Sequence, residues 1–206
     1  MRGDGEWVNR VRLALADRPA DCVPESECEI RAAVTLILRP AADTGGTPEA
    51  LFVRRAEVAG DPWSGHVALP GGRRDPGDAD LLDTARRETL EETGLRLERE
   101  DHLGRLAEIH PRSRHLPSIC VTPFVAWMAA EQEVRVNHEL TDHVWIPVPA
   151  LSDPGYRSTL VREAPSVREF PAVDYEGNVI WGLTFAILED FLAVLSVSTA
   201  TGLSNR

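Results

Sequence analysis

The chain has 206 residues, of which 43% are hydrophobic and 27% are charged, and this balance is typical of a globular protein. A net charge of −11 argues against a nucleic-acid backbone as the main partner, because such binding depends on neutralising phosphates. No stretch approaches the ~18 apolar residues that suggest a membrane-spanning helix. We therefore expect a single domain over residues 1–206 and no membrane partner.

The first part of the chain predicts a helix followed by short strands. Residues 7–16 form an amphipathic helix, and with a polar linker they make up an N-terminal segment over residues 1–30. Short, β-branched and almost uncharged runs then predict strands at 31–38, 50–55 and 66–69. The first two look like a hairpin with a long tip.

The second half predicts more strands and a long final helix. The expected strands are residues 103–109, 119–128, 144–149, 170–175 and 179–181, with a turn at Glu176-Gly-Asn. Pro147 and Pro149 limit their strand to an edge or a strand end. Residues 182–195 are apolar at helical spacing, and 196–206 are expected to be a frayed tail. Strands and helices intermingle without regular βαβ alternation, which indicates an α/β fold with a mixed sheet between helices.

The cysteines and the N-terminus indicate the compartment. Cys22 and Cys28 could belong to a zinc site only with two further ligands nearby, and none are there. The first residues, MRGDGEW, lack the apolar core of a signal peptide. We expect these two cysteines and Cys120 to be reduced thiols in a cytoplasmic protein.

Between the two halves, residues 69–95 read LPGGRRDPGDADLLDTARRETLEETGL. Residues 81–93 contain neither Gly nor Pro, which favours a helix. Asp80 is the expected N-cap, Asp83 lies in the first turn, and Gly94 stands where a left-handed C-cap belongs. The run Leu69-Pro-Gly-Gly just ahead predicts a sharp turn with free backbone groups.

Glu88, Glu91 and Glu92 stand at i, i+3 and i+4, so they share one face of this helix. Like charges at these spacings destabilise a helix by roughly 0.2–0.5 kcal/mol per pair. A hard divalent cation relieves this repulsion best, because it takes oxygen ligands and tolerates several carboxylates. An ordinary acidic surface helix is the alternative, and the glycine turn beside the glutamates favours the metal site.

The same stretch resembles the Nudix box, G-x5-E-x7-R-E-U-x-E-E-x-G-U, in which U is aliphatic. The matching residues are Gly72, Arg87, Glu88, Glu91, Glu92, Gly94 and Leu95. Asp78 stands in place of the first Glu, Thr89 replaces the aliphatic residue, and the segment between Asp78 and Arg87 is one residue longer. The resemblance implies an α/β/α sandwich with a mixed β-sheet. It also implies hydrolysis of a nucleoside diphosphate linked to another group, with Mg²⁺ or Mn²⁺ as cofactor.

The resemblance further implies roles for individual residues. The metal ligands would be Glu88, Glu91, Glu92 and the backbone carbonyl of Gly71. Arg87 would orient a glutamate of the cluster, and Glu88 or Glu92 could accept the proton of the attacking water. Family members also use a carboxylate from outside the box. Our candidate is Glu139, with Asp142 and Glu133 as alternatives.

Arginines outside the box are candidates for binding the phosphates. Arg54 and Arg55 point to opposite faces of their strand, so only one of them can face the site. Arg112 and Arg114 would share a face if extended, which suits a diphosphate, although surface arginines also serve solubility. Trp63 could cover a base or a pantetheine arm, or anchor its own loop.

Two motifs outside the box resemble the coenzyme A pyrophosphatase branch of the family. They are Gly65-His-Val-Ala-Leu-Pro-Gly-Gly and Val179-Ile-Trp-Gly-Leu-Thr-Phe. The branch signature resembles LLTxTxxxRx3Gx3FPGG, and here Asp61 replaces its arginine and Leu69 its phenylalanine. Coenzyme A or a derivative is the implied substrate. The alternatives are ADP-ribose, a dinucleoside polyphosphate or a noncanonical nucleoside triphosphate. A non-catalytic nucleotide sensor would usually have lost box glutamates. Family members are often homodimers, but nothing here marks an interface.

Overall fold

The computed structural model describes residues 2–16, 23–24, 27–41, 47–58, 64–111, 118–162 and 167–201. Its helices are α1 (Arg2–Ala16), α2 (Leu81–Thr93), α3 (Val148–Ser152) and α4 (Gly182–Thr201). Its strands are β1 (Ile30–Pro40), β2 (Pro48–Arg55), β3 (Val67–Ala68), β4 (Gly71–Arg73), β5 (His102–Arg105), β6 (Ile119–Trp127), β7 (Leu140–Pro147), β8 (Arg157–Arg162), β9 (Arg168–Tyr175) and β10 (Asn178–Trp181).

The main sheet is mixed, and this confirms the predicted fold class. Its strand order is β3-β2-β1-β6-β5, with β4 paired to β1 and β7 paired to β2. β1 is parallel to β6 and antiparallel to β2 and β4. The predicted hairpin is therefore present, and it pairs Leu38 with Ala50 next to its tip. Pro147 ends β7, as expected from its missing N–H.

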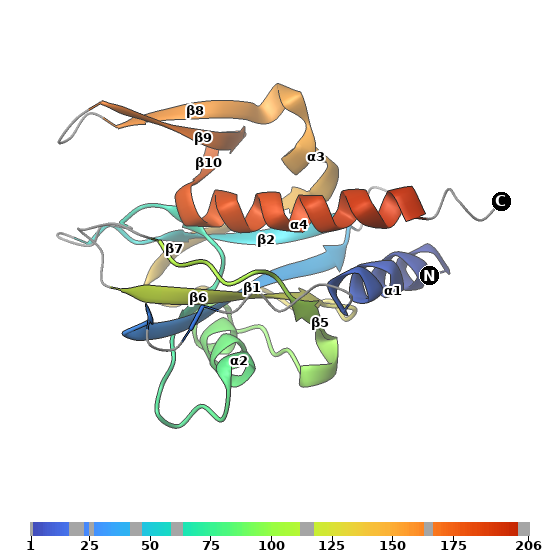
Figure 1. Ribbon diagram of the computed structural model, residues 1–206, viewed down its shortest axis with the longest axis horizontal. Coiled ribbons are helices and arrows are strands. Elements are labelled where there is room, and N and C mark those ends of the chain that lie inside the picture. The colour runs from blue at the N-terminus through green and yellow to red at the C-terminus, as the bar shows by residue number, and fades with distance from the viewer. Residues whose placement is uncertain are drawn as a thin grey trace.

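Helices cover both faces of this sheet (Figure 1). α2 lies on one face, and α1 and α4 lie on the other. Alternation along β1 sends Leu36 into the larger core cluster with α4, whereas Ile37 packs with Leu51 and Leu95 on the α2 side. The chain thus folds as an α/β/α sandwich. Within the described part of the chain, no helix has the length and hydropathy that a membrane span requires.

A second, three-stranded sheet lies beyond α4 (Figure 1), and its strand β10 contacts β3 of the main sheet. The predicted turn joins β9 to β10, with Glu176 and Gly177 at positive φ. The exposed polar run that forms β8 was not predicted as a strand.

Several element ends differ from the prediction. α1 begins at Arg2 instead of Trp7, and β7 begins at Leu140 instead of Val144. β5 ends at Arg105, beyond which Ile109 forms an isolated bridge to β6. α4 continues to Thr201, so residues 196–201 of the expected tail are helical.

The expectation of reduced thiols is wrong for two of the three cysteines. Cys28 and Cys120 form a disulfide with a Cα–Cα distance of 5.6 Å, while Cys22 lies outside the described residues. The parallel pairing of β1 with β6 places Arg31 opposite Cys120. This register brings the segment before β1 within the Cα separation that a disulfide requires.

Removal of this cross-link should destabilise the fold, because the bond joins residues 92 apart in sequence. For a loop of that size, the chain-entropy model gives about 4–5 kcal/mol. We expect Cys28→Ala/Cys120→Ala to lose roughly this much unfolding free energy in non-reducing urea titrations, and Cys22→Ala to lose little. In dithiothreitol the bond is broken in the wild type as well. If the wild type and the double variant are then equally stable, the loss without reductant comes from the cross-link and not from the substitutions. Equal stability without reductant would contradict the bond.

Candidate active site

The helix that carries the three glutamates forms as the sequence predicts. Asp80 has extended backbone geometry, and its Oδ1 accepts the N–H of Asp83 at 2.8 Å. At the other end Gly94 is left-handed, with φ 72, and its N–H donates to the carbonyl of Leu90 at 2.9 Å. Both caps therefore agree with the expected boundaries, and the register of the glutamates follows from them.

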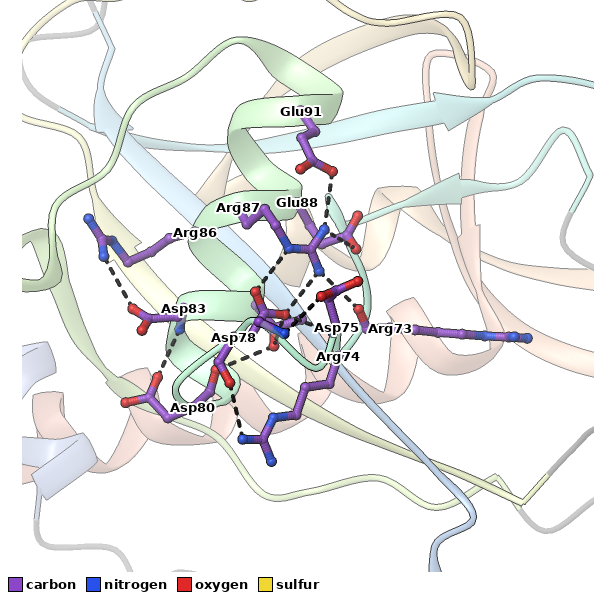
Figure 2. Close-up of polar contacts among 12 residues, drawn as sticks. Arg73, Arg74, Asp75, Asp78, Asp80, Asp83, Arg86, Arg87, Glu88 and Glu91 are labelled. Carbon is purple, nitrogen blue, oxygen red and sulfur yellow. Dashed lines mark hydrogen bonds and ion pairs between the residues drawn. The ribbon is translucent and has the colours of Figure 1, made fainter.

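Arg87 is the centre of the polar contacts on this helix (Figure 2). Its Nε and Nη2 each donate to a carboxylate oxygen of Asp78 at 3.0 Å, and Nη2 also donates to the carbonyl of Arg73 at 3.0 Å. Its Nη1 donates to Glu88 Oε1 at 2.9 Å and to Glu91 Oε2 at 3.1 Å. One guanidinium therefore connects the acidic loop, strand β4 and two of the three glutamates.

Asp78, at the position of the first Glu of the box, is a buried partner of this arginine. It also accepts the backbone N–H of Asp75 and the hydroxyl of Thr84, both at 2.9 Å. The hydrogen bonds from Arg87 are the main reason why its pKa lies well below the usual range, and they outweigh burial, which acts in the opposite direction. The aspartate thus holds Arg87 from a loop that is one residue longer than the pattern.

Glu92 and Glu88 are in the opposite electrostatic situation. Glu92 is 4% exposed, and burial raises its pKa to about 7, although the N–H of Gly71 donates to its Oε2 at 2.8 Å. Burial also raises the pKa of Glu88. The charge of Glu88 further raises the pKa of Glu92, that of Glu91 raises the pKa of Glu88, and Glu139 raises both. Burial and neighbouring acids therefore outweigh the positive charges of Arg87, beside Glu88, and Arg55, which acts on Glu92.

The expected turn at Gly71–Gly72 is instead strand β4, which pairs with Val34 and Ala33 of β1. Gly71 has φ 150, and a side chain there would collide with the carbonyl of Ala33. A Cβ on Gly72 would lie 2.5 Å from the carboxyl carbon of Glu88. Gly71 lets β4 approach β1, and Gly72 leaves room for the carboxylate of Glu88, which explains their place in the motif better than a turn does.

The predicted arginines separate as strand alternation requires. Arg54 donates to Asn178 Oδ1 at 2.8 Å in β10, on the side of the second sheet. Arg55 instead lowers the pKa of Glu92 by its positive charge, so it faces the glutamates. Arg112, Arg114 and Trp63 lie outside the described residues.

Among the candidate carboxylates outside the box, Glu139 is the one that contributes to the raised pKa values of Glu88 and Glu92. It precedes β7, its backbone carbonyl accepts the N–H of Ala56 at 2.8 Å, and its charge acts on both Glu88 and Glu92. Glu133 instead pairs with Arg135 at 2.7 Å, and Asp142 accepts the N–H of its neighbour His143 at 2.8 Å.

The donor chemistry of this cluster fits a divalent ion, because neighbouring carboxylates supply the hard oxygen ligands that such an ion takes. Glu91 is turned toward Arg87 and solvent, with its side chain 55% exposed. In the described portions of the chain, no group of three or more His, Cys, Asp or Glu side chains is gathered closely enough to hold a metal. The fit therefore rests on Glu88 and Glu92, with Glu139 nearby.

Sequence reasoning did not identify Thr35 as a supporting residue. The buried hydroxyl of Thr89 donates to Thr35 Oγ1 at 3.2 Å, which connects α2 to the centre of the sheet. A signal was present, because a threonine at an aliphatic position of a buried helix face needs a polar partner. Residues 31–38 contain one such threonine.

Comparison with known proteins gives consistent results. The model of the NUDIX domain matches residues 29–165. The mitochondrial coenzyme A diphosphatase NUDT8 of Homo sapiens is 30% identical over 175 residues, which are 82% of this chain and 72% of that protein. The Nudix hydrolase NudL of Yersinia pestis is 33% identical over 201 residues, which are 93% of this chain and 94% of the relative.

Solved structures resemble the fold. A MutT/nudix family protein from Enterococcus faecalis superimposes with a TM-score of 0.59 and 20% identity, over 87% of this chain and 65% of that one. The C. elegans Ap4A hydrolase in a binary complex gives 0.52 and 21%, over 82% and 98%. At these identities the likeness concerns the fold alone.

The hydrogen bonds of Asp78 predict a pH-dependent loss of stability in Asp78→Asn. At pH 7 we expect the variant to lose about 1.5–3 kcal/mol of unfolding free energy, because Arg87 loses a charged acceptor. A lowered folded-state pKa contributes stability that is complete above the ordinary value of 3.8 and is lost as the pH falls below it.

The difference between the wild type and Asp78→Asn should therefore narrow in urea titrations below about pH 4. Asp75→Asn, in the same loop, is the matched control and should lose less stability. A pH-independent difference, or none at pH 7, would contradict this account of Asp78.

Proposed function

Because this chain belongs to the Nudix hydrolase family, we propose that it is a metal-dependent pyrophosphohydrolase. The proposed reaction is hydrolysis of a nucleoside diphosphate linked to another group, with coenzyme A or a derivative as the substrate. The observation that carries the proposal is the position of Glu88 and Glu92 beside Gly72 and Gly71, with both pKa values raised by burial although Arg87 pairs with Glu88.

We assign Mg²⁺ or Mn²⁺ to a ligand set that contains the three box glutamates and one backbone oxygen, namely Glu88, Glu91, Glu92 and the carbonyl of Gly71. Such an ion, when bound, neutralises phosphate charge and activates water. Arg87 orients Glu88 and Glu91 through its Nη1. Glu88 or Glu92 accepts the proton of the attacking water, and Glu139 adds negative charge beside them.

Arg55 is the proposed phosphate ligand in the described part of the chain, because it lies on the side of the glutamates. Arg112, Arg114 and Trp63 remain predictions for phosphate and substrate binding. The relative NUDT8, a coenzyme A diphosphatase by name, supports the substrate choice. Because Asp61 stands where the branch signature has an arginine, ADP-ribose, a dinucleoside polyphosphate and a noncanonical nucleoside triphosphate remain alternative substrates. A cytoplasmic location and a homodimer also remain predictions.

Glu92→Gln should lower kcat by roughly 100-fold or more, because a neutral amide is a poor ligand for a divalent ion. The variant should unfold at nearly the wild-type temperature, since the amide oxygen can still accept the N–H of Gly71 and no buried charge remains. Steady-state kinetics and thermal unfolding check both parts. Glu100→Gln, an exposed acid outside the cluster, is the control. Near-normal turnover by Glu92→Gln would contradict its assignment as a ligand.

A substrate panel with Mg²⁺ or Mn²⁺ tests the substrate class. Coenzyme A should be cleaved with the highest kcat/KM, and mass spectrometry should identify 4′-phosphopantetheine and 3′,5′-ADP. Turnover of ADP-ribose without coenzyme A cleavage would replace the proposed substrate within the same reaction class. If the wild-type protein cleaved none of the diphosphates, the hydrolase proposal itself would be wrong.

A further inference from the structure

A groove of about 550 Å³ opens on the α2 side of the main sheet, beside the edge strand β7. One wall consists of the strand residues Arg39, His143 and Trp145, and the other consists of residues 131–134. This volume is within the range of small-molecule sites in proteins. None of the roles proposed above uses the groove.

Strand register connects the groove to the glutamate cluster. His143 lies opposite Val53 across the β2–β7 pair, and Arg55 follows Val53 by two residues on the same strand. At about 3.4 Å per residue, the near end of the groove is roughly 7 Å along the strand from Arg55. A substrate whose phosphates lie beside Arg55 can therefore reach the groove with its next chemical group.

One loop segment serves both sites. Residues 131–134 form a groove wall, and the same segment continues to Glu139. It is held against the end of α2, because Arg135 N–H donates to the carbonyl of Thr93 at 2.8 Å and Asn137 N–H donates to that of Glu92 at 3.0 Å. The groove and the glutamates are thus parts of one connected structure.

The strand wall presents a flat surface whose charge is balanced. The guanidinium carbon of Arg39 lies 3.9 Å from the ring centre of Trp145. Its Nε and Nη2 both donate to Glu49 Oε2, at 3.1 and 3.0 Å, which fixes the guanidinium over the indole. The ion pair leaves no surplus positive charge on this wall, so it offers little attraction to a phosphate.

The opposite wall provides acidic and fixed polar groups. It contains Glu131 and Glu133, and the latter is paired with Arg135. Gln132 is held by two hydrogen bonds to the backbone of Arg96, at 2.9 and 3.0 Å. Carboxylate acceptors opposite a planar platform suit a flat, uncharged ring that carries an amino group, and they repel an anion.

We propose that this groove binds the adenine base of the substrate, against the Arg39–Trp145 pair and His143, while the diphosphate lies at the glutamate cluster. The inference rests on the proposed function, because it takes the substrate to be a nucleoside diphosphate. In this arrangement Trp145 and His143 determine the affinity for the nucleoside part of the substrate, and the glutamate cluster acts on the reacting phosphate.

Tryptophan fluorescence tests the location of the base directly. AMP, titrated in the presence of Mg²⁺, should quench the emission of the wild-type protein, and ribose 5-phosphate should not. Trp145→Phe should remove most of this quenching while keeping a ring under Arg39. Trp181→Phe, a partly buried tryptophan of β10, is the matched control and should retain it.

Kinetics provide a second readout on a variant that leaves Trp145 intact. His143→Ala should raise KM for the preferred diphosphate about tenfold, in line with the contribution of base stacking, with kcat within about twofold of wild type. A fall in kcat with KM unchanged would overturn the assignment of His143 to base binding.

Three outcomes of the titration would overturn the groove proposal. Loss of quenching in Trp181→Phe but not in Trp145→Phe would move the base to the second sheet. A response of Trp145 to 4′-phosphopantetheine but not to AMP would assign the groove to the other arm. Hydrolysis of diphosphates by a protein whose Trp145 emission does not respond would reject the groove and leave the proposed function standing, whereas absence of all hydrolysis would reject that function.

Discussion

The arrangement of the site depends on one guanidinium. Arginine has five N–H donors in a planar fork, and each of the five donors of Arg87 has an acceptor here. Asp78 holds the inner edge of the fork and is itself fixed by backbone and hydroxyl donors. The outer nitrogen can therefore set the positions of Glu88 and Glu91. A lysine could not replace it, because a single ammonium cannot reach the acidic loop, strand β4 and the helix face together.

Asp78 and Glu92 are both buried carboxylates, but their pKa values shift in opposite directions. Asp78 is buried with a charged partner, and its pKa is lowered. Glu92 is buried with one backbone donor beside two other acids, and its pKa is raised to about 7. Retaining the charge of Glu92 costs folding free energy, which Arg55 offsets only in part and a bound cation would offset further. Such an acid, next to a strand without side chains at Gly71 and Gly72, is typical of a site that is completed by a ligand.

Local signals were enough to predict the helix that carries the three candidate glutamates. Capping residues and the spacing of the glutamates predict α2 and its face, and alternation predicts that Arg54 and Arg55 diverge. Alternation could not say which arginine faces the glutamates, because that depends on how β2 lies between β3 and β7. The disulfide of Cys28 with Cys120 and the pairing of β4 with β1 were missed for a related reason. Both follow from the register of β1 with distant strands, which no local pattern specifies.

Two departures from the box are each accompanied by a second difference that accommodates them. Thr89 takes an aliphatic position at the interface of α2 with the sheet, where an unpaired hydroxyl would be costly. Thr35 on β1 provides its partner, so the interface keeps its packing and gains one buried hydrogen bond. In the same way, the shorter side chain of Asp78 occurs with a longer loop, and it still reaches Arg87 through both oxygens. The contacts that the motif provides are therefore retained, although the residues at these two positions differ from the motif.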